Sequence, residues 1–291
     1  MFKGTGVAIV TPFKSDFSVD YQALENLTQH LITNKVDYIV ALGTTGETPT
    51  LTHEEKYSVA KVIKDVVNKR IPLVLGIGGN NTAEVLKAIE KGDVEGYHAI
   101  LSVCPYYNKP TQKGIYLHYK QISENSPLPL IIYNVPGRTG VNISAETTLQ
   151  LAADCKNIIA TKEACGNMEQ IMTIIRNRPE GFLVISGDDA ITFPLIACGA
   201  DGVISVTANA LPLQFSEMVR KALKGDFANA KPMHMSMLEF YQAMFAEGSP
   251  SGVKAALNIL GMLENVVRLP MVSVSDPHYN HIAGLLNKIN S

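Results

Sequence analysis

Eight short apolar runs, each followed by a longer polar or amphipathic stretch, constrain this chain more than any other feature of its sequence. They lie at residues 6–10, 38–42, 73–77, 99–103, 130–133, 158–162, 183–186 and 202–206. Their nearly continuous hydrophobicity is typical of strands that are buried on both faces. Eight βα units are the number that closes a (β/α)8 barrel. We therefore predict an α/β fold of the TIM-barrel type.

Several of the intervening helices have readable start signals. Asp20 precedes a helix over 21–33, and Thr52 with Glu55 has the spacing of a capping box before a helix over 53–68. Further helices are predicted over 82–91, 145–153 and 190–198. An open, doubly wound sheet shows the same alternation, so periodicity alone does not exclude it. Units of similar length, without a GxGxxG segment after the first strand, favour the closed barrel.

The alternation of strands and helices ends after the eighth apolar run. The rest of the chain contains only helical patterns, over 213–224, 227–246, 252–264 and 280–290. We predict a barrel over residues 1–224 that contains the functional residues, and a C-terminal helical extension over residues 225–291.

Composition narrows the class of partner. The chain has 46% hydrophobic residues and a formal net charge of −2 without a basic run, which indicates no nucleic-acid or membrane partner. No signal-peptide pattern and no apolar stretch of about 18 residues is found. The four cysteines lack CxxC spacing and the seven histidines lack metal-ligand spacing, so we expect a cytoplasmic protein with small-molecule substrates, no metal and no cofactor.

Polar residues follow several of the predicted strands, where barrels of this type carry their chemistry. Thr44 and Thr45 lie between glycines after the second run, and their adjacent hydroxyls can bind a carboxylate or relay a proton. Tyr107 follows the fourth run, Tyr133 ends the fifth, and Arg138 comes shortly after it. The alternatives are an ordinary turn for the threonines, core positions for the tyrosines and a solvated arginine. Arg138 has the planar donor geometry that grips a carboxylate.

Lys162 ends the apolar sixth run and is followed by Glu163. If its side chain points into the barrel, burial lowers the pKa of the amine from about 10.4 toward neutrality, which produces the free amine that a Schiff base requires. The alternative is that Lys162 points outward and pairs with Glu163. The strand alone does not decide between a nucleophile and a surface ion pair.

Three ordered motifs carry a resemblance. They are Gly-Thr-Thr-Gly-Glu at 43–47, Tyr-Asn-Val-Pro-Gly-Arg-Thr at 133–139 and Lys-Glu-Ala at 162–164. Together they resemble the dihydrodipicolinate synthase and N-acetylneuraminate lyase family, and the similarity extends through the barrel to segments 186–189 and 202–206. Segment 133–139 is similar to the synthase branch of that family.

The resemblance implies a role for each residue at the barrel mouth. Lys162 forms a Schiff base with pyruvate, and Tyr133 passes protons at the reacting carbon. Thr45 links Tyr133 to a Tyr107 that comes from a neighbouring subunit, and Thr44 belongs to the same chain of hydroxyls.

The remaining implied roles concern substrate binding. Arg138 holds the carboxylate of L-aspartate-4-semialdehyde, while Gly187 and Ile204 line the pyruvate pocket. The implied reaction gives 4-hydroxy-tetrahydrodipicolinate in the diaminopimelate route to lysine, in a homotetramer built as a dimer of dimers. A sugar-acid lyase of the same family and a metabolite-binding barrel without activity remain as alternatives.

In this family, an inhibitor site for L-lysine lies at the dimer interface. The residues that the resemblance places there are His53, Lys56, Asn80, Glu84 and Tyr106. Asn80 and Glu84 are four residues apart, which we interpret as one helical face. Lys56 stands where we associate lysine-sensitive relatives with histidine. We expect its charge to repel the inhibitor or to pair with Glu84; the alternative is that Lys56 points into solvent and changes nothing. We therefore expect weak inhibition, with half-effect above about 1 mM lysine.

Overall fold

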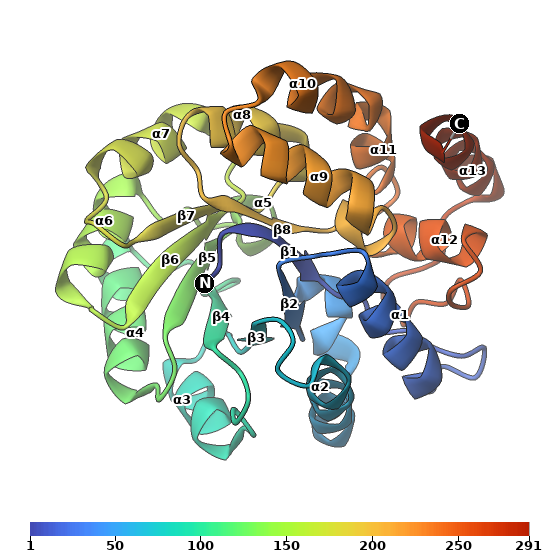
Figure 1. Ribbon diagram of the computed structural model, residues 1–291. Helices are drawn as coiled ribbons and strands as arrows, with labels where there is room; N and C mark the ends of the chain where they lie inside the picture. Colours follow the sequence, from blue (N-terminus) through green and yellow to red (C-terminus); the bar gives the residue numbers. More distant parts are fainter. Residues whose placement is uncertain (291) are drawn as a thin grey trace.

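The computed structural model describes residues 1–290 and contains a closed barrel of eight parallel strands in chain order (Figure 1). The strands are β1 (Gly4–Ala8), β2 (Tyr38–Ala41), β3 (Leu73–Gly76), β4 (Ala99–Val103), β5 (Leu130–Asn134), β6 (Ile158–Glu163), β7 (Leu183–Ser186) and β8 (Gly202–Ser205). β1 pairs with both β2 and β8, which closes the sheet. The predicted (β/α)8 barrel is therefore confirmed, and the open sheet is excluded.

The first strand differs most from its prediction. β1 begins at Gly4, two residues before the predicted run, because Gly4 and Thr5 pair with Gly202 and Val203 of β8. The predicted run was placed by hydrophobicity, and neither Gly4 nor Thr5 carries that signal. Hydrogen bonding to a distant strand, which the local sequence does not show, decides where β1 starts.

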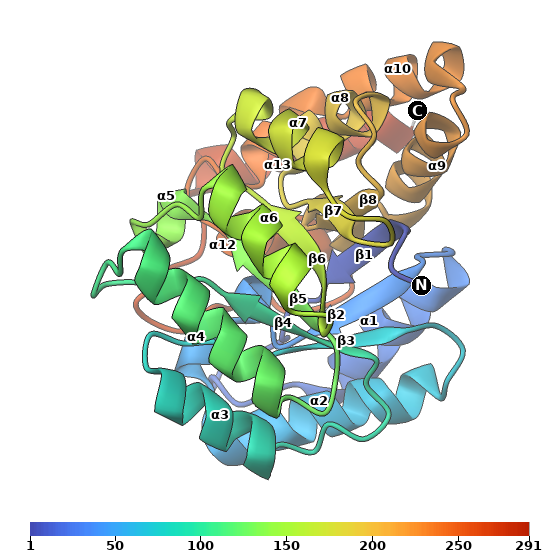
Figure 2. The ribbon, with the colours of Figure 1, turned by 90° about the vertical axis from the view of Figure 1, so that its left-hand side faces the viewer.

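Helices cover the outside of the barrel and bury their apolar sides against the strands. Those that follow the strands are α1 (Tyr21–Thr33), α2 (His53–Val67), α3 (Thr82–Lys91), α4 (Gln112–Asn125), α6 (Ala145–Asp154), α7 (Met168–Asn177), α8 (Thr192–Ala197) and α9 (Pro212–Leu223). Figure 2 shows α4, α6 and α7 side by side on this outer layer. A short helix, α5 (Pro136–Thr139), and four 3₁₀ turns lie at the carboxyl ends of strands.

Side chains that accept backbone hydrogen bonds begin most of these helices. The predicted capping box is present: the backbone N–H of Glu55 donates to the Thr52 hydroxyl, and the backbone N–H of Thr52 donates to the Glu55 carboxylate. Helices α4 and α7 were not among those predicted, although Thr111 and Asn167 cap their first turns. Both caps are ordinary start signals that could have located these helices.

Four helices follow α9: α10 (Phe227–Ser236), α11 (Leu238–Ala243), α12 (Ser251–Ile259) and α13 (Asp276–Asn290). Figure 1 shows α11, α12 and α13 grouped at one side of the barrel, beyond α9. The helical character predicted after β8 is thus observed. The division at residue 224 stays a prediction.

Two of the predicted C-terminal helices were too long. The helix over 227–246 is interrupted at the buried Met237, whose backbone N–H bonds to His234 three residues back. The helix over 252–264 ends at Ile259, because Gly261 adopts a positive φ of 71° and turns the chain back. Within residues 1–290, no helix is long and apolar enough to cross a membrane.

The interior of the barrel is filled differently at its two ends. Near the amino ends of the strands, the side chain of Tyr38 fills the interior. A Cβ atom on Gly6 would lie only 2.2 Å from Cε2 of the Tyr38 ring, so this position requires glycine. Phe2 packs edge-on against Tyr38, with ring centroids 5.4 Å apart. Near the carboxyl ends, the interior instead holds Tyr133 and Lys162. The interior is therefore filled by aromatic rings near the amino ends of the strands, and the buried lysine lies near their carboxyl ends.

Candidate active site

Lys162 is a buried lysine on the inner face of β6. Its side chain is 5% exposed, and in the strand register Lys162 lies opposite Tyr133 of β5. The Nζ atom lies 4.2 Å from the centroid of the Tyr133 ring. Because residues two apart in a strand share a face, Ala160 and Lys162 both point into the barrel, as the nucleophile hypothesis requires.

The environment of Lys162 favours a neutral amine. Burial lowers the pKa of Lys162 to about 7, the nearby positive charge of Arg138 acts in the same direction, and the carboxylate of Asp189 opposes both. A lysine with this pKa is unprotonated in a substantial fraction of molecules at neutral pH. The free amine is the form that attacks a carbonyl group.

Glu163 does not pair with Lys162. As the next residue in β6 it faces the opposite side of the strand, where its Oε2 accepts a hydrogen bond from Asn134 Nδ2 at 3.0 Å. The side chain is fully buried, and burial raises the pKa of Glu163 to about 7. The surface ion pair that the sequence left open is therefore excluded.

A hydroxyl partner accompanies Tyr133. Burial raises the pKa of Tyr133, while the charge of Arg138 and a hydrogen bond with the Thr44 side chain lower it in part. Thr45 is buried. The resemblance gave Thr45 the link to Tyr133, whereas within residues 1–290 the threonine bonded to that hydroxyl is Thr44.

Gly187 packs closely against Lys162, and its proposed part in a pyruvate pocket, like that of Ile204, stays a prediction. A Cβ atom on Gly187 would lie 3.0 Å from Cε of Lys162 and 2.9 Å from Cβ of Ala164, so a larger residue would displace the lysine. Ile204 belongs to the same buried interior cluster as Tyr133. Gly187 therefore leaves room for the lysine side chain, and Ile204 contributes to the apolar interior of the barrel.

Asp189 is an acidic residue near the amine that was not among the predicted site residues. It is 2% exposed, and its Oδ2 accepts hydrogen bonds from the backbone N–H groups of Val206 and Thr207 at 3.2 and 2.8 Å. Burial raises the pKa of Asp189, although these bonds oppose the shift. The signal available in the sequence was a second acid directly after the seventh strand.

Arg138 and Tyr107 lie at the edge of the site. Arg138 belongs to α5 and is exposed, and no carboxylate within residues 1–290 forms an ion pair with it. Tyr107 is 88% exposed and has a positive φ of 71°. Within the described chain, Tyr107 contacts neither Thr45 nor Tyr133. The role implied for Tyr107 therefore stays a prediction.

The five residues predicted to bind L-lysine are not all arranged as expected. Asn80 precedes α3, which begins at Thr82 after the cap Asn81, so Asn80 and Glu84 do not share a helical face. Oε1 of Glu84 lies 3.9 Å from Nζ of Lys87, and no ion pair joins Glu84 to Lys56 within residues 1–290. His53 and Tyr106 are exposed, and the lysine site itself stays a prediction.

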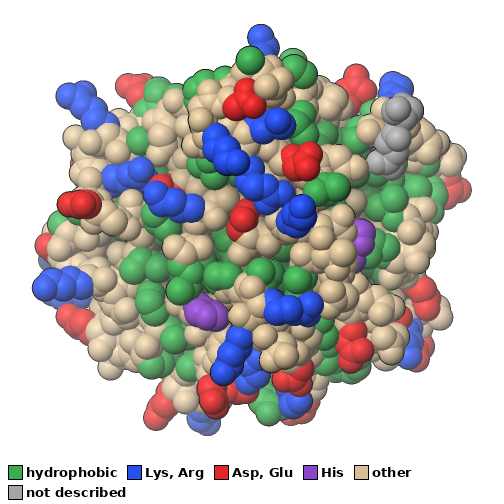
Figure 3. All heavy atoms as spheres, in the orientation of Figure 1, with side chains coloured by type: hydrophobic (Ala, Val, Ile, Leu, Met, Phe, Trp, Pro, Cys, Tyr) green, Lys and Arg blue, Asp and Glu red, His purple; other side chains and the backbone are tan. Residues whose placement is uncertain are grey.

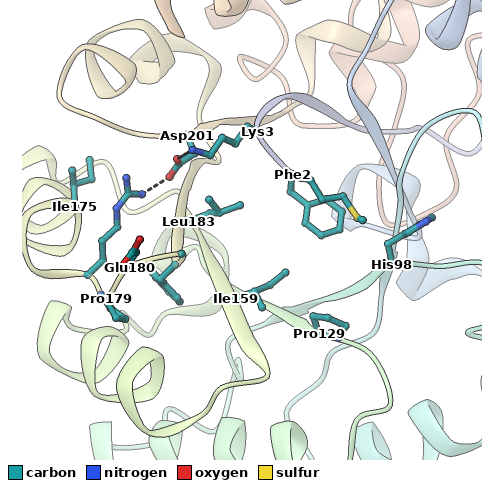
Figure 4. Close-up of a pocket in the computed structure, with 14 residues that line it drawn as sticks. Phe2, Lys3, His98, Pro129, Ile159, Ile175, Pro179, Glu180, Leu183 and Asp201 are labelled. Carbon is teal, nitrogen blue, oxygen red and sulfur yellow. Dashed lines mark hydrogen bonds and ion pairs between the residues drawn. The ribbon is translucent and has the colours of Figure 1, made fainter.

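A cavity of about 720 Å³ lies at the other end of the barrel, among the amino ends of the strands. Figure 4 shows Phe2, Leu183 and Ile159 around it, with Asp201 between two basic side chains. Figure 3 shows apolar side chains in the middle of this face with Lys and Arg beside them. The acid there is already paired with Lys3 and Arg178, and the cavity lies far from Lys162.

A parallel barrel that holds a buried lysine amine with a lowered pKa beside a tyrosine in its mouth has the architecture and site of a class I aldolase-type lyase. The sequence comparisons specify that class further. Residues 1–289 match the model of the Dihydrodipicolinate synthetase family, and the chain belongs to that family. This confirms the family resemblance drawn from the three motifs.

Relatives match over nearly the whole chain. A 4-hydroxy-tetrahydrodipicolinate synthase of Phocaeicola vulgatus is 53% identical, covering 99% of this chain and 97% of the relative. The solved dihydrodipicolinate synthase of Thermotoga maritima superposes with a TM-score of 0.97 at 40% identity, covering 100% and 99% of the two chains. The chloride-inhibited enzyme from Acinetobacter baumannii, solved with pyruvate, gives the same TM-score, identity and coverage.

Proposed function

We propose that this chain condenses pyruvate with L-aspartate-4-semialdehyde to give 4-hydroxy-tetrahydrodipicolinate, in the diaminopimelate route to lysine. The observation that carries the proposal is the Lys162 amine, held with a lowered pKa beside Tyr133 in a barrel of this family. Relatives named for this reaction cover almost the entire chain, which supports the same substrates here.

The geometry supplies a path for the first half of the reaction. The amine of Lys162 attacks the ketone carbon of pyruvate, and loss of water gives a protonated imine. The imine withdraws electrons, so a methyl proton can leave to the hydroxyl chain of Tyr133 and Thr44, which produces a neutral enamine. Apolar neighbours such as Ile204 limit the access of water to this carbon.

The enamine carbon then bonds to the aldehyde carbon of the second substrate, whose oxygen takes up a proton. The amino group of the semialdehyde next attacks the former ketone carbon and closes the ring. Lys162 leaves as the free amine and is ready for another pyruvate. The chain's own groups thus act as nucleophile and proton carrier, and the atoms balance as two substrates joined with loss of water.

The direct test supplies both substrates and measures the cyclic product by mass spectrometry. Product formation that requires pyruvate and the semialdehyde together supports the proposal. Cleavage of a keto sugar acid to pyruvate, with no consumption of the semialdehyde, would instead assign the chain to the sugar-acid lyases of the family.

Arg138→Ala will impair use of the semialdehyde more than formation of the pyruvate imine. Arg138 is exposed at the mouth and has no carboxylate partner among residues 1–290, so its guanidinium is available to the second substrate. Loss of a charge-assisted bidentate contact costs about 1.5–3 kcal/mol. Steady-state kinetics with each substrate varied will show the loss in kcat/KM for the semialdehyde. An equal or larger loss in imine formation would contradict this role.

The rate of imine formation will rise with pH until about pH 7 and then level off. The folded protein holds the pKa of Lys162 at about 7, below its ordinary value, so lowering the pH removes the reactive free amine. Well below that pKa the rate should fall about tenfold per pH unit. Borohydride trapping after short exposures to pyruvate, across a pH series, measures this rate. A midpoint near the ordinary lysine pKa of about 10.4 would contradict the burial argument.

The active form is proposed to be a homotetramer, a dimer of dimers, in which a neighbour delivers Tyr107. The 88% exposure of this tyrosine and its absence from the hydroxyl chain of its own subunit support the proposal. Sedimentation at assay concentration should show the tetramer, and Tyr107→Phe should lower kcat without changing the assembly. A fully active monomer would contradict the prediction.

A cytoplasmic location is part of the same proposal. All four cysteines are free, and Cys104 and Cys155 are buried. Unpaired cysteines fit a reducing compartment, where disulfides rarely persist.

A further inference from the structure

Behind the mouth of the barrel lies a group of charges that the reaction above does not use. Glu47 ends the Gly-Thr-Thr-Gly-Glu segment, and its Oε1 lies 2.5 Å from Nζ of Lys254 in α12. Its Oε2 accepts the backbone N–H of Arg268 at 3.0 Å. Lys254 is completely buried and Glu47 is 4% exposed. We call Glu47, Lys254 and Arg268 the Glu47 network.

The network is anchored on its C-terminal side. Lys254 Nζ also donates to the carbonyl of Val266 at 2.9 Å and lies 4.0 Å from the centroid of the Phe13 ring. Arg268 forms two hydrogen bonds with Glu55 of α2, at 2.6 and 2.7 Å. A buried charge that loses one of its partners strongly destabilises the folded protein. The side chains of the Glu47 network are therefore held in the one arrangement that keeps all of these contacts.

Glu47 connects this anchor to the catalytic hydroxyl. Its backbone N–H donates to the carbonyl of Thr44 at 3.2 Å, which closes the short 3₁₀ turn Thr44–Gly46. Glu47 itself has a positive φ of 52°, a left-handed backbone conformation that is unfavourable for a residue with a Cβ atom. The side-chain contacts of Glu47 compensate for this conformation and keep the turn in place.

We propose that Glu47 is a positioning residue for proton transfer: through it, Lys254 and Arg268 of the C-terminal segment hold the Thr44 hydroxyl against Tyr133. This inference rests on the function proposed above and adds a role for residues that follow the barrel. Lys162 lies on β6, and within residues 1–290 no hydrogen bond or ion pair joins it to the Glu47 network. Disturbing the network therefore affects the proton step and leaves the amine in place.

Two measurements with pyruvate as the only substrate separate imine formation from the proton transfer that follows it. Borohydride trapping counts imine on Lys162, and nuclear magnetic resonance in deuterium oxide follows exchange of the pyruvate methyl protons, which requires reversible enamine formation. Dividing exchange by trapped imine removes any effect of misfolded protein. In Lys254→Met, trapping should stay within about twofold of the parent, while exchange per imine falls about 10- to 100-fold, as for a catalytic group displaced by about 1 Å.

A double variant distinguishes positioning from stability. Glu47→Gln with Lys254→Met removes both buried charges and should recover much of the thermal stability lost in the single variant. Exchange per imine should remain low, because the ion pair that holds the turn is absent. The matched control is Lys61→Met, which removes a lysine paired with Asp65 on the surface and should behave as the parent.

Each outcome decides one question. If exchange per imine in Lys254→Met equals that of the parent, or recovers fully in the double variant, the positioning role is wrong. If the parent forms no imine on Lys162 and exchanges no methyl protons, the proposed function fails instead. A loss of exchange with trapping preserved supports the positioning role.

Discussion

Lys162→Ala will form no trapped adduct with pyruvate, and its turnover will fall by roughly 10³-fold or more, as expected when a covalent nucleophile is removed. Lys162 is the buried amine that lies over the Tyr133 ring, and burial holds its pKa at about 7. In the parent protein, borohydride should fix one reduced three-carbon unit per chain. Mass mapping of peptides locates the unit on residue 162.

Lys61→Ala is the matched control for this experiment, because it removes an exposed lysine with an ordinary surface ion pair. It should form as much adduct as the parent. Full labelling of Lys162→Ala, or an adduct mapped to Lys254, would show that another amine is the nucleophile. The fully buried Lys254 is engaged by Glu47 and Val266 and should remain unlabelled.

Tyr133→Phe will keep the imine and lose the proton step. The variant retains the ring that lies 4.2 Å from Lys162 Nζ but removes the hydroxyl that bonds to Thr44. Turnover and methyl exchange should both fall about 10²- to 10⁴-fold, the usual contribution of a positioned acid–base group. Trapping with borohydride should continue at a rate within about fivefold of the parent, because the ring still buries the amine.

Thr44→Val and Thr45→Val extend this test to the two threonines. Only Thr44 bonds to the Tyr133 hydroxyl within the described chain, so Thr44→Val should lower exchange per imine more than Thr45→Val does. A larger loss in Thr45→Val than in Thr44→Val would instead support Thr45 as the partner of Tyr133, as the family resemblance implied. Unchanged exchange in Tyr133→Phe would remove the tyrosine from the proton path altogether.

Much of the fold was readable because the barrel depends on local patterns. All eight strands overlap the predicted apolar runs, and α1 spans residues 21–33 as its cap and periodicity predict. The differences arise where distant contacts decide. β1 begins at Gly4 because β8 pairs with it, and Met237 interrupts a helix that its local pattern continues.

The site shows the same division between local and distant information. Lys162, Tyr133 and Gly187 could be placed because each ends or follows a strand, and parallel strands end at one edge. The choice between Thr44 and Thr45 depends on a 3₁₀ turn that the sequence does not specify. The contact of Glu47 with Lys254 joins residues more than two hundred positions apart, and neither residue has a local signal for it.

The pairing of β1 with β8 also has a consequence during protein synthesis. Gly4 cannot meet Gly202 until almost two hundred residues have been translated, which takes roughly 10–40 s at about 5–20 residues per second. Throughout that interval the nascent chain carries an unpaired parallel edge. Lys254 emerges later still, so the Glu47 carboxylate has no counter-charge while the ribosome finishes the barrel. An unfinished chain can therefore contain all eight strands before Lys254 is available to pair with Glu47.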